Sequence, residues 1–186
     1  MPGNSVDNQI PGETEAWLRG PLPDVSFLLT PAAHALLQAS IDIERAAASL
    51  TPKEVWRTPG GAPSVGFHLR HIAGSIDRLL TYARGGQLGA NQLRELSRES
   101  LPGEPAEESV TLVSTVAGRV EEVIQALRTT PDELLAEPRL VGRAKLPSTV
   151  FGLLFHIAEH TQRHTGQIVT TARIVRSSST GEESRS

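Results

Sequence analysis

Apolar residues recur at helical spacing in four long segments of this chain, and this pattern restricts the possible folds more than any other feature of the sequence. The expected helices span residues 31–50, 64–83, 109–127 and 148–175. Each carries an apolar stripe on one face, and no segment shows a convincing period of two, as a half-buried strand would. Four helices of this length in one small domain predict an all-α fold, a four-helix bundle.

The length of 186 residues suits one domain with a sizeable core and is short for two. Residues 1–22 are rich in Gly, Pro and polar residues and are expected to be poorly ordered, with Trp17 and Leu18 anchoring their end to the body. Residues 23–176 form the predicted bundle. Residues 177–186 have nothing to bury and are expected to be a disordered tail.

Composition excludes several classes of function. The chain has no cysteine, so disulfides, thiolate metal sites and a cysteine nucleophile are ruled out, and any metal needs His, carboxylate or water ligands. The net charge of −3 and the lack of a basic run argue against contact with nucleic acid. No signal peptide and no apolar stretch long enough for a membrane span is found, so a cytoplasmic location without membrane contact is expected.

Three of the six histidines, His156, His160 and His164, stand four residues apart in the last predicted helix. Residues four apart lie one above the other on one face of a helix. His160 and His164 also follow the spacing of the apolar stripe, which continues at Ile168. A buried imidazole without a partner costs free energy, so something must satisfy this pair, and a divalent ion would do so.

The second predicted helix offers a third histidine. Of its two candidates, His68 and His71, the latter is better placed because it lies beside Ile72 on the border of the apolar stripe. His71, His160 and His164 would form a three-histidine site. Three protein ligands leave one coordination position open, as in catalytic zinc sites. From spacing alone, histidines that merely pack in the core remain an alternative.

Other polar residues near the candidate ligands are expected to line a pocket or to contact the ligands: His68, Ser75, Arg78, His156 and Gln167. Arg78 would either reach an anionic cofactor or act as a solvated charge or salt-bridge partner. His156 would be a pocket wall or a packed histidine, and Gln167 would contact a ligand or a neighbouring helix. His34 is expected to be a surface or packing histidine. No buried Asp or Glu stands out as a general base.

The sequence motifs of two other kinds of metalloenzyme, H-E-x-x-H proteases and di-iron bundles, are not matched by this chain. The stretch HTQRH has the ligand spacing of H-E-x-x-H proteases but lacks the glutamate that acts as the base. Di-iron bundles need Glu-x-x-His pairs, and no Glu stands three residues before any of these histidines. No serine-nucleophile or phosphate-loop motif is found either.

Two stretches, WRTPGGAPSVGFHLRHIAGSIDRLL and LLFHIAEHTQRHTGQI, resemble the DinB family of the DinB/YfiT-like metalloenzymes. The resemblance covers most of the chain, from about Leu28 to Val175. It implies an up-down-down-up four-helix bundle that carries a divalent ion, nickel or zinc, on three histidines. By motif these are His71, His160 and His164.

The resemblance also implies a direction for function. Relatives in the wider superfamily include thiol-dependent transferases and isomerases, and a chain without cysteine would need a low-molecular-weight thiol as cofactor. The leading hypothesis is a mononuclear metal-dependent enzyme, a thiol S-transferase or a metal-assisted hydrolase, that acts on a small molecule. The alternatives are a non-catalytic metal-binding or stress-response bundle with a structural metal, and a plain bundle with packed histidines that mediates dimerisation. A homodimer would be common for the family.

Overall fold

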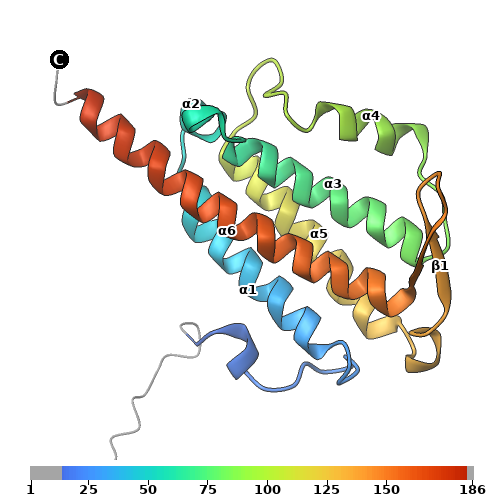
Figure 1. The fold of residues 1–186 in the computed structure, drawn as a ribbon. Helices are drawn as coiled ribbons and strands as arrows, with labels where there is room; N and C mark the ends of the chain where they lie inside the picture. Colours follow the sequence, from blue (N-terminus) through green and yellow to red (C-terminus); the bar gives the residue numbers. More distant parts are fainter. Residues whose placement is uncertain (1–13, 184–186) are drawn as a thin grey trace, which may run out of the picture.

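The computed structural model of the protein describes residues 14–183, with side chains described for residues 14–178. It is mostly helical, with one small two-stranded sheet (Figure 1). The helices are α1 (Thr30–Ala47), α2 (Pro52–Val55), α3 (Val65–Ala83), α4 (Ala90–Arg98), α5 (Ser109–Thr129) and α6 (Val150–Glu183). The strands are β1 (Pro138–Val141) and β2 (Leu146–Thr149), and three short 3-10 helices span Ala16–Leu18, Pro59–Gly61 and Asp132–Leu134.

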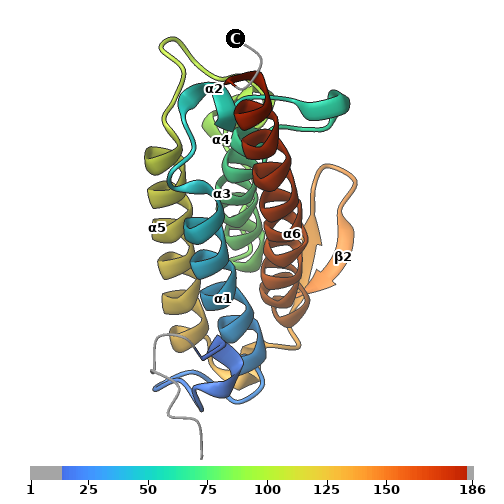
Figure 2. The same ribbon diagram turned by 90° about the vertical axis from the view of Figure 1, so that its left-hand side faces the viewer.

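The four long helices lie side by side and enclose one apolar core (Figure 2). Both α1 and α3 pack against α5 and α6. Representative side chains of the core, one from each long helix, are fully or almost fully buried: Leu36, Ile72, Val123 and Ile157. Burying one such side chain contributes about 1.5–3 kcal/mol, so the shared core fixes α3 against α6.

Side-chain caps set where the two histidine-bearing helices begin. The Ser64 hydroxyl accepts a hydrogen bond of 3.1 Å from the backbone N–H of Phe67 at the start of α3. At the start of α6, the Thr149 hydroxyl accepts a bond of 3.0 Å from the N–H of Gly152. Each cap contributes about 1 kcal/mol and fixes the helical register in which the histidines follow.

The connection between α5 and α6 contains an antiparallel hairpin, which corrects the expectation that no segment forms a strand. Pro138 pairs with Thr149 and Val141 with Leu146. Each strand has only four residues and none of them is buried, so the strands are too short and too shallow to give a clear apolar signal in the sequence. The hairpin is fastened to the end of α3 by Arg139, which donates a hydrogen bond of 2.8 Å to the carbonyl of Ala83.

Helix α4 was not predicted, and it has no buried residue. Without a buried face it lacks the apolar stripe from which the longer helices were predicted. Helix α6 continues to Glu183, beyond the predicted end at Val175, because propagation of a formed helix needs no apolar stripe. Although α6 is long, neither it nor any other helix within residues 14–183 is apolar enough to cross a membrane.

The N-terminal segment is attached through a residue other than the predicted ones. Ala16 is 1% exposed, whereas Trp17 is 63% and Leu18 55% exposed. The backbone N–H of Ala16 also donates a hydrogen bond of 3.0 Å to Oε1 of Gln38 in α1. The small side chain therefore anchors the segment, and the two larger ones do not. The prediction for residues 1–13 lies outside the described residues.

Candidate metal centre

Three histidines from two helices meet where α3 packs against α6. His71 of α3 and His160 and His164 of α6 each offer one ligand atom, and these atoms lie within 4.8 Å of one another. Nε2 of His71 lies 3.0 Å from Nε2 of His160. Two nitrogens that bind one tetrahedral zinc ion at about 2.0–2.1 Å lie about 3.3 Å apart, so the observed spacing is close to that of a chelate. The structure thus brings together the three histidines singled out in the sequence.

A buried carboxylate, Glu99, contacts His71 and was not predicted from the sequence. Its Oε2 lies 2.7 Å from Nδ1 of His71, and its Oε1 accepts a hydrogen bond of 2.8 Å from Nη1 of Arg78. Glu99 is 6% exposed and is therefore a buried acid beside the site, although no Asp or Glu stood out in the sequence as a general base. Arg78 is 9% exposed and is the partner in this salt bridge, not a solvated charge. Glu99 follows the exposed helix α4, and no apolar pattern leads to it.

The hydroxyl of Ser75 faces the same point as the histidine nitrogens. Its Oγ lies 3.3 Å from Nε2 of His160 and 3.5 Å from Nε2 of His71. Arg78 donates a hydrogen bond of 3.3 Å to this oxygen. Because Arg78 supplies the donor, the Ser75 proton is free to point toward the histidines.

His68 adds a fourth imidazole, one turn before His71. It is buried, and its Nδ1 lies 3.0 Å from Nδ1 of His164. One of these two nitrogens must carry a proton for this contact to be favourable. When His164 carries this proton, its Nε2 keeps the lone pair that an ion requires. His68 therefore contacts a candidate ligand without belonging to the three-histidine group.

Burial lowers the pKa of three of the rings, His68, His160 and His164, and so favours their uncharged form. Desolvation, followed by the neighbouring His164, lowers the pKa of His68 to about 4 and that of His160 to about 4. The pKa of His164 is also lowered, first by burial and then by His71, although a side-chain hydrogen bond with Gln167 raises it. Neutral imidazoles carry the lone pair that a metal ion requires.

The hydrogen-bond pattern fits a cation at this point. Glu99 as a carboxylate can only accept, so His71 carries its proton on Nδ1 and turns a lone pair on Nε2 toward His160. Nδ1 of His160 is buried and has no hydrogen-bond partner within the described residues. An ion on Nε2 would leave this nitrogen unpartnered as well, so the case for a cation rests on the two Nε2 atoms that face each other. If Nε2 of His71 and Nε2 of His160 bound one cation, no proton would be needed between them. Neutral imidazoles are suitable ligands for zinc, nickel or copper.

The remaining predicted residues lie around this centre or outside it. His156 is exposed, and its Nδ1 lies 3.1 Å from Oε2 of Glu159. The centroid of its ring is 5.4 Å from that of His160. It therefore sits at the edge of the cluster. His34 is buried elsewhere, where its Nε2 lies 2.9 Å from the carbonyl oxygen of Gly20 and ties the N-terminal segment to α1.

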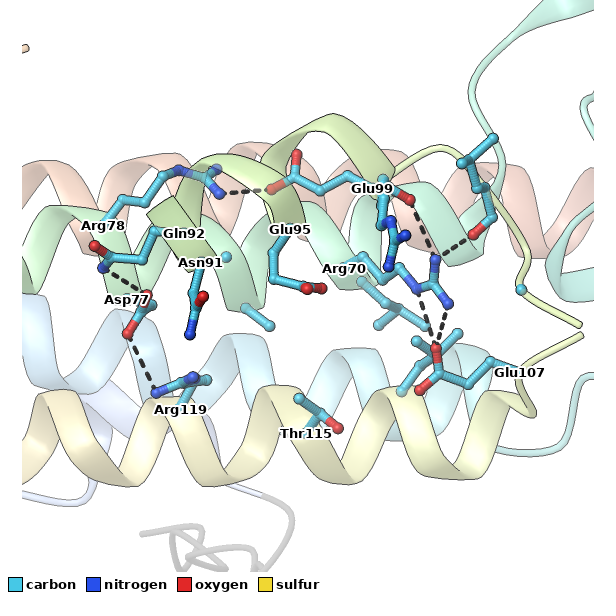
Figure 3. Close-up of a pocket in the computed structure, with 17 residues that line it drawn as sticks. Arg70, Asp77, Arg78, Asn91, Gln92, Glu95, Glu99, Glu107, Thr115 and Arg119 are labelled. Atoms are coloured by element: carbon cyan, nitrogen blue, oxygen red, sulfur yellow. Dashed lines mark hydrogen bonds and ion pairs between the residues drawn. The ribbon is translucent and has the colours of Figure 1, made fainter. Parts of the chain in front are cut away.

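A cavity of about 640 Å³ lies between α3, α4 and α5 (Figure 3). Glu99 and Arg78 line it, but none of the histidines does. Ion pairs stand at its two ends, Arg70 with Glu107 at 2.6 Å and Arg119 with Asp77 at 3.6 Å. The cavity is thus a separate feature, and its lining residue Glu99 also contacts His71.

The fold and the site together define a helical protein with a three-histidine cluster between two long helices. The sequence model of the DinB superfamily matches residues 35–168, a span that includes all three histidines. The chain therefore belongs to the DinB superfamily, which confirms the resemblance noted in the sequence.

The fold is shared with a solved structure. It is described as the crystal structure of the conserved protein of locus from Enterococcus faecalis. The TM-score is 0.61 at 21% sequence identity, and the alignment covers 79% of this chain and 96% of that chain. At this identity the likeness concerns the fold alone. None of the curated proteins matches the chain.

Proposed function

We propose that this member of the DinB superfamily is a mononuclear metal-dependent enzyme whose divalent ion is held by His71, His160 and His164. The observation that carries the proposal is the convergence of one ligand atom from each histidine within 4.8 Å, with a buried carboxylate fixing one of the rings. Three protein ligands leave a coordination position for substrate or water, which is the arrangement of catalytic rather than structural zinc sites.

The proposal includes the finer architecture of the family, an up-down-down-up four-helix bundle. Support comes from the packing of α1 and α3 against both α5 and α6. Support also comes from the ribbon, in which α1 and α6 run in one direction and α3 and α5 in the other (Figure 1). In such a bundle, side chains from facing helices can converge on one ion in the core.

Nickel and zinc are the proposed ions, and either would supply a Lewis acid that lowers the pKa of a coordinated water or thiol. The chain itself would contribute orientation and proton handling. Glu99 holds the His71 ring, and Arg78 orients the Ser75 hydroxyl. Ser75 Oγ, 3.3 Å from Nε2 of His160, is the hydroxyl best placed to hydrogen-bond a group at the open position.

The proposed reaction class is thiol S-transfer, with metal-assisted hydrolysis as the second possibility within the same site. An exogenous low-molecular-weight thiol is required because the chain has no cysteine. Among the described residues, Glu99 is the carboxylate that contacts the three-histidine cluster, and Arg78 already binds it. This favours a reaction in which the ion, rather than a side-chain base, activates the nucleophile.

The test is a screen of thiols against small electrophiles, with hydrolysis of activated esters in parallel, on protein loaded with zinc or with nickel. We expect turnover that requires the metal and is lost in His71→Ala. The control is His156→Ala, which removes an exposed imidazole from the edge of the cluster. Metal-loaded protein without turnover across the panel would contradict the enzyme proposal and favour a structural metal.

A further inference from the structure

The geometry points to Glu99 as the positioning residue of this centre, the carboxylate that fixes the tautomer and the orientation of His71. The inference rests on the proposed metal site and deepens it, because it assigns a function to a residue outside the ligand set. It concerns four residues that come together from α3 and from the segment after α4: His71, Gly74, Arg78 and Glu99.

The contact between Glu99 and His71 determines which ring nitrogen faces the centre. Oε2 of Glu99 lies 2.7 Å from Nδ1 of His71. A carboxylate oxygen accepts only, so the proton of the neutral ring resides on Nδ1 and the lone pair on Nε2. Nε2 is the nitrogen that lies 3.0 Å from His160. Carboxylate–histidine–metal arrangements of this kind orient the ligand and raise its basicity.

Arg78 holds the carboxylate of Glu99 through the oxygen that does not face His71. Its Nη1 donates to Oε1 of Glu99 at 2.8 Å, which leaves Oε2 for His71. Glu99 and Arg78 are both buried, and opposite charges that are removed from water together must satisfy each other through hydrogen bonds. The ion pair therefore supports the acceptor role of Glu99 (Figure 3).

Gly74 of α3 lies directly against the ion pair of Glu99 and Arg78. A Cβ atom added at Gly74 would lie 2.6 Å from Oε1 of Glu99 and 2.7 Å from Nη1 of Arg78. Real Cβ atoms do not approach other atoms so closely, so a side chain at this position would force the ends of these two side chains to shift. His71, Gly74 and Arg78 share one face of α3 through their spacing of three and four residues. Glu99 lies on this face.

Arg70, the neighbour of His71 in α3, fastens the segment that carries Glu99. It donates hydrogen bonds to the carbonyl of Arg98 at 3.2 Å, on one side of Glu99, and to those of Leu101 and Pro102 on the other side. It also forms an ion pair of 2.6 Å with Glu107. The backbone on both sides of Glu99 is thus hydrogen-bonded to α3, the helix that bears His71, and this holds the Glu99 carboxylate next to the His71 ring.

The experiment compares Glu99→Ala with Glu95→Ala. Glu95 is an exposed carboxylate one turn before Glu99 and has no contact with the histidines among the described residues, so it is a matched control. Affinity is measured by titration with Co²⁺ alone and by competition with Zn²⁺. The tautomer of His71 is read from its ring ¹⁵N shifts in the metal-free protein, a signature that a merely structural ion pair would not determine.

We expect Glu99→Ala to weaken metal binding about 10- to 100-fold and to remove the Nδ1–H tautomer as the dominant form of His71. Glu95→Ala should leave both unchanged. Equal affinity of Glu99→Ala and the control, or a wild-type His71 with its proton on Nε2, overturns the inference. A wild-type protein that binds no metal contradicts the proposed function instead, and the tautomer comparison still decides whether Glu99 orients His71.

Two further variants keep the test decisive if Glu99→Ala does not fold. Glu99→Gln keeps the size of the side chain but has a single acceptor oxygen, which Arg78 takes. Its amide N–H then faces Nδ1 of His71, so we expect the Nδ1–H tautomer to be lost and metal binding to weaken. Gly74→Ala leaves the carboxylate in the chain but displaces it through the added Cβ, so we expect weaker metal binding although no contact residue has been removed. Wild-type affinity in Gly74→Ala, with an unchanged His71 tautomer, counts against the inference.

Discussion

Nε2 of His71 lies 3.0 Å from Nε2 of His160, although 89 residues separate them in the chain. The two helices that carry these residues pack against each other throughout the core, so the contact is part of the fold rather than an addition to it. The four predictions that follow test the centre and the core that positions it.

A divalent ion that binds only the folded protein should raise its thermal stability. At a free metal concentration about 100 times the dissociation constant, the gain is about 2.7 kcal/mol, or roughly 5–11 °C in Tm for a domain of this size. We expect this shift with zinc or nickel in scanning calorimetry, with reversal by EDTA. His164→Ala should abolish the shift and His156→Ala should keep it. A shift of the same size in both variants would place the ion elsewhere.

Stability of the metal-free protein should fall as the pH is lowered. The folded-state pKa values of His68 and His160 are lowered to about 4 from 6.5, so between these values the unfolded chain binds more protons than the folded one. The contribution of both rings is full above about pH 6.5 and is lost as the pH falls through this window toward about 4.

The measurement is the urea midpoint with EDTA present, at about pH 7.5 and about pH 5. We expect the lower midpoint at the lower pH, and a smaller decrease in His68→Leu, in which one of the two buried rings is gone. A midpoint that stays constant or rises on acidification would show that these rings are not held neutral by the fold.

The core beneath the histidines should be sensitive to truncation. Ile157 precedes His160 by three residues in α6 and is 1% exposed. Replacement of a buried Ile by Ala typically costs about 2–5 kcal/mol, so Ile157→Ala should lower the free energy of unfolding by that amount. Ile174, on the same helix, is 44% exposed, and Ile174→Ala should change the free energy of unfolding by less than about 0.5 kcal/mol. Similar losses in both variants would contradict the burial pattern of α6.

The three histidines could be predicted from the sequence because they follow the same periodicity as the core. His160 and His164 fall on the apolar stripe of α6, and His71 borders that of α3. Helical geometry alone then orients them toward the interface of the two helices. The helical fold was predicted for the same reason, since each long helix buries one continuous face.

Glu99 and the hairpin could not be predicted, because tertiary contacts rather than local patterns determine them. Glu99 reaches His71 across 28 residues of chain, through a helix without any buried residue. The hairpin has four-residue strands that lie largely at the surface. The N-terminal anchor is a further example, since Ala16 is buried while the larger Trp17 beside it is not.

The most direct test of the account is the metal content of the purified protein, measured by inductively coupled plasma mass spectrometry. We predict close to one equivalent of a divalent ion per chain in the wild type, full retention in His34→Ala, and loss in His71→Ala, His160→Ala and His164→Ala. His34 is the suitable control because it is buried but contacts Gly20 rather than the cluster. A full equivalent of metal in His160→Ala would contradict the three-histidine centre.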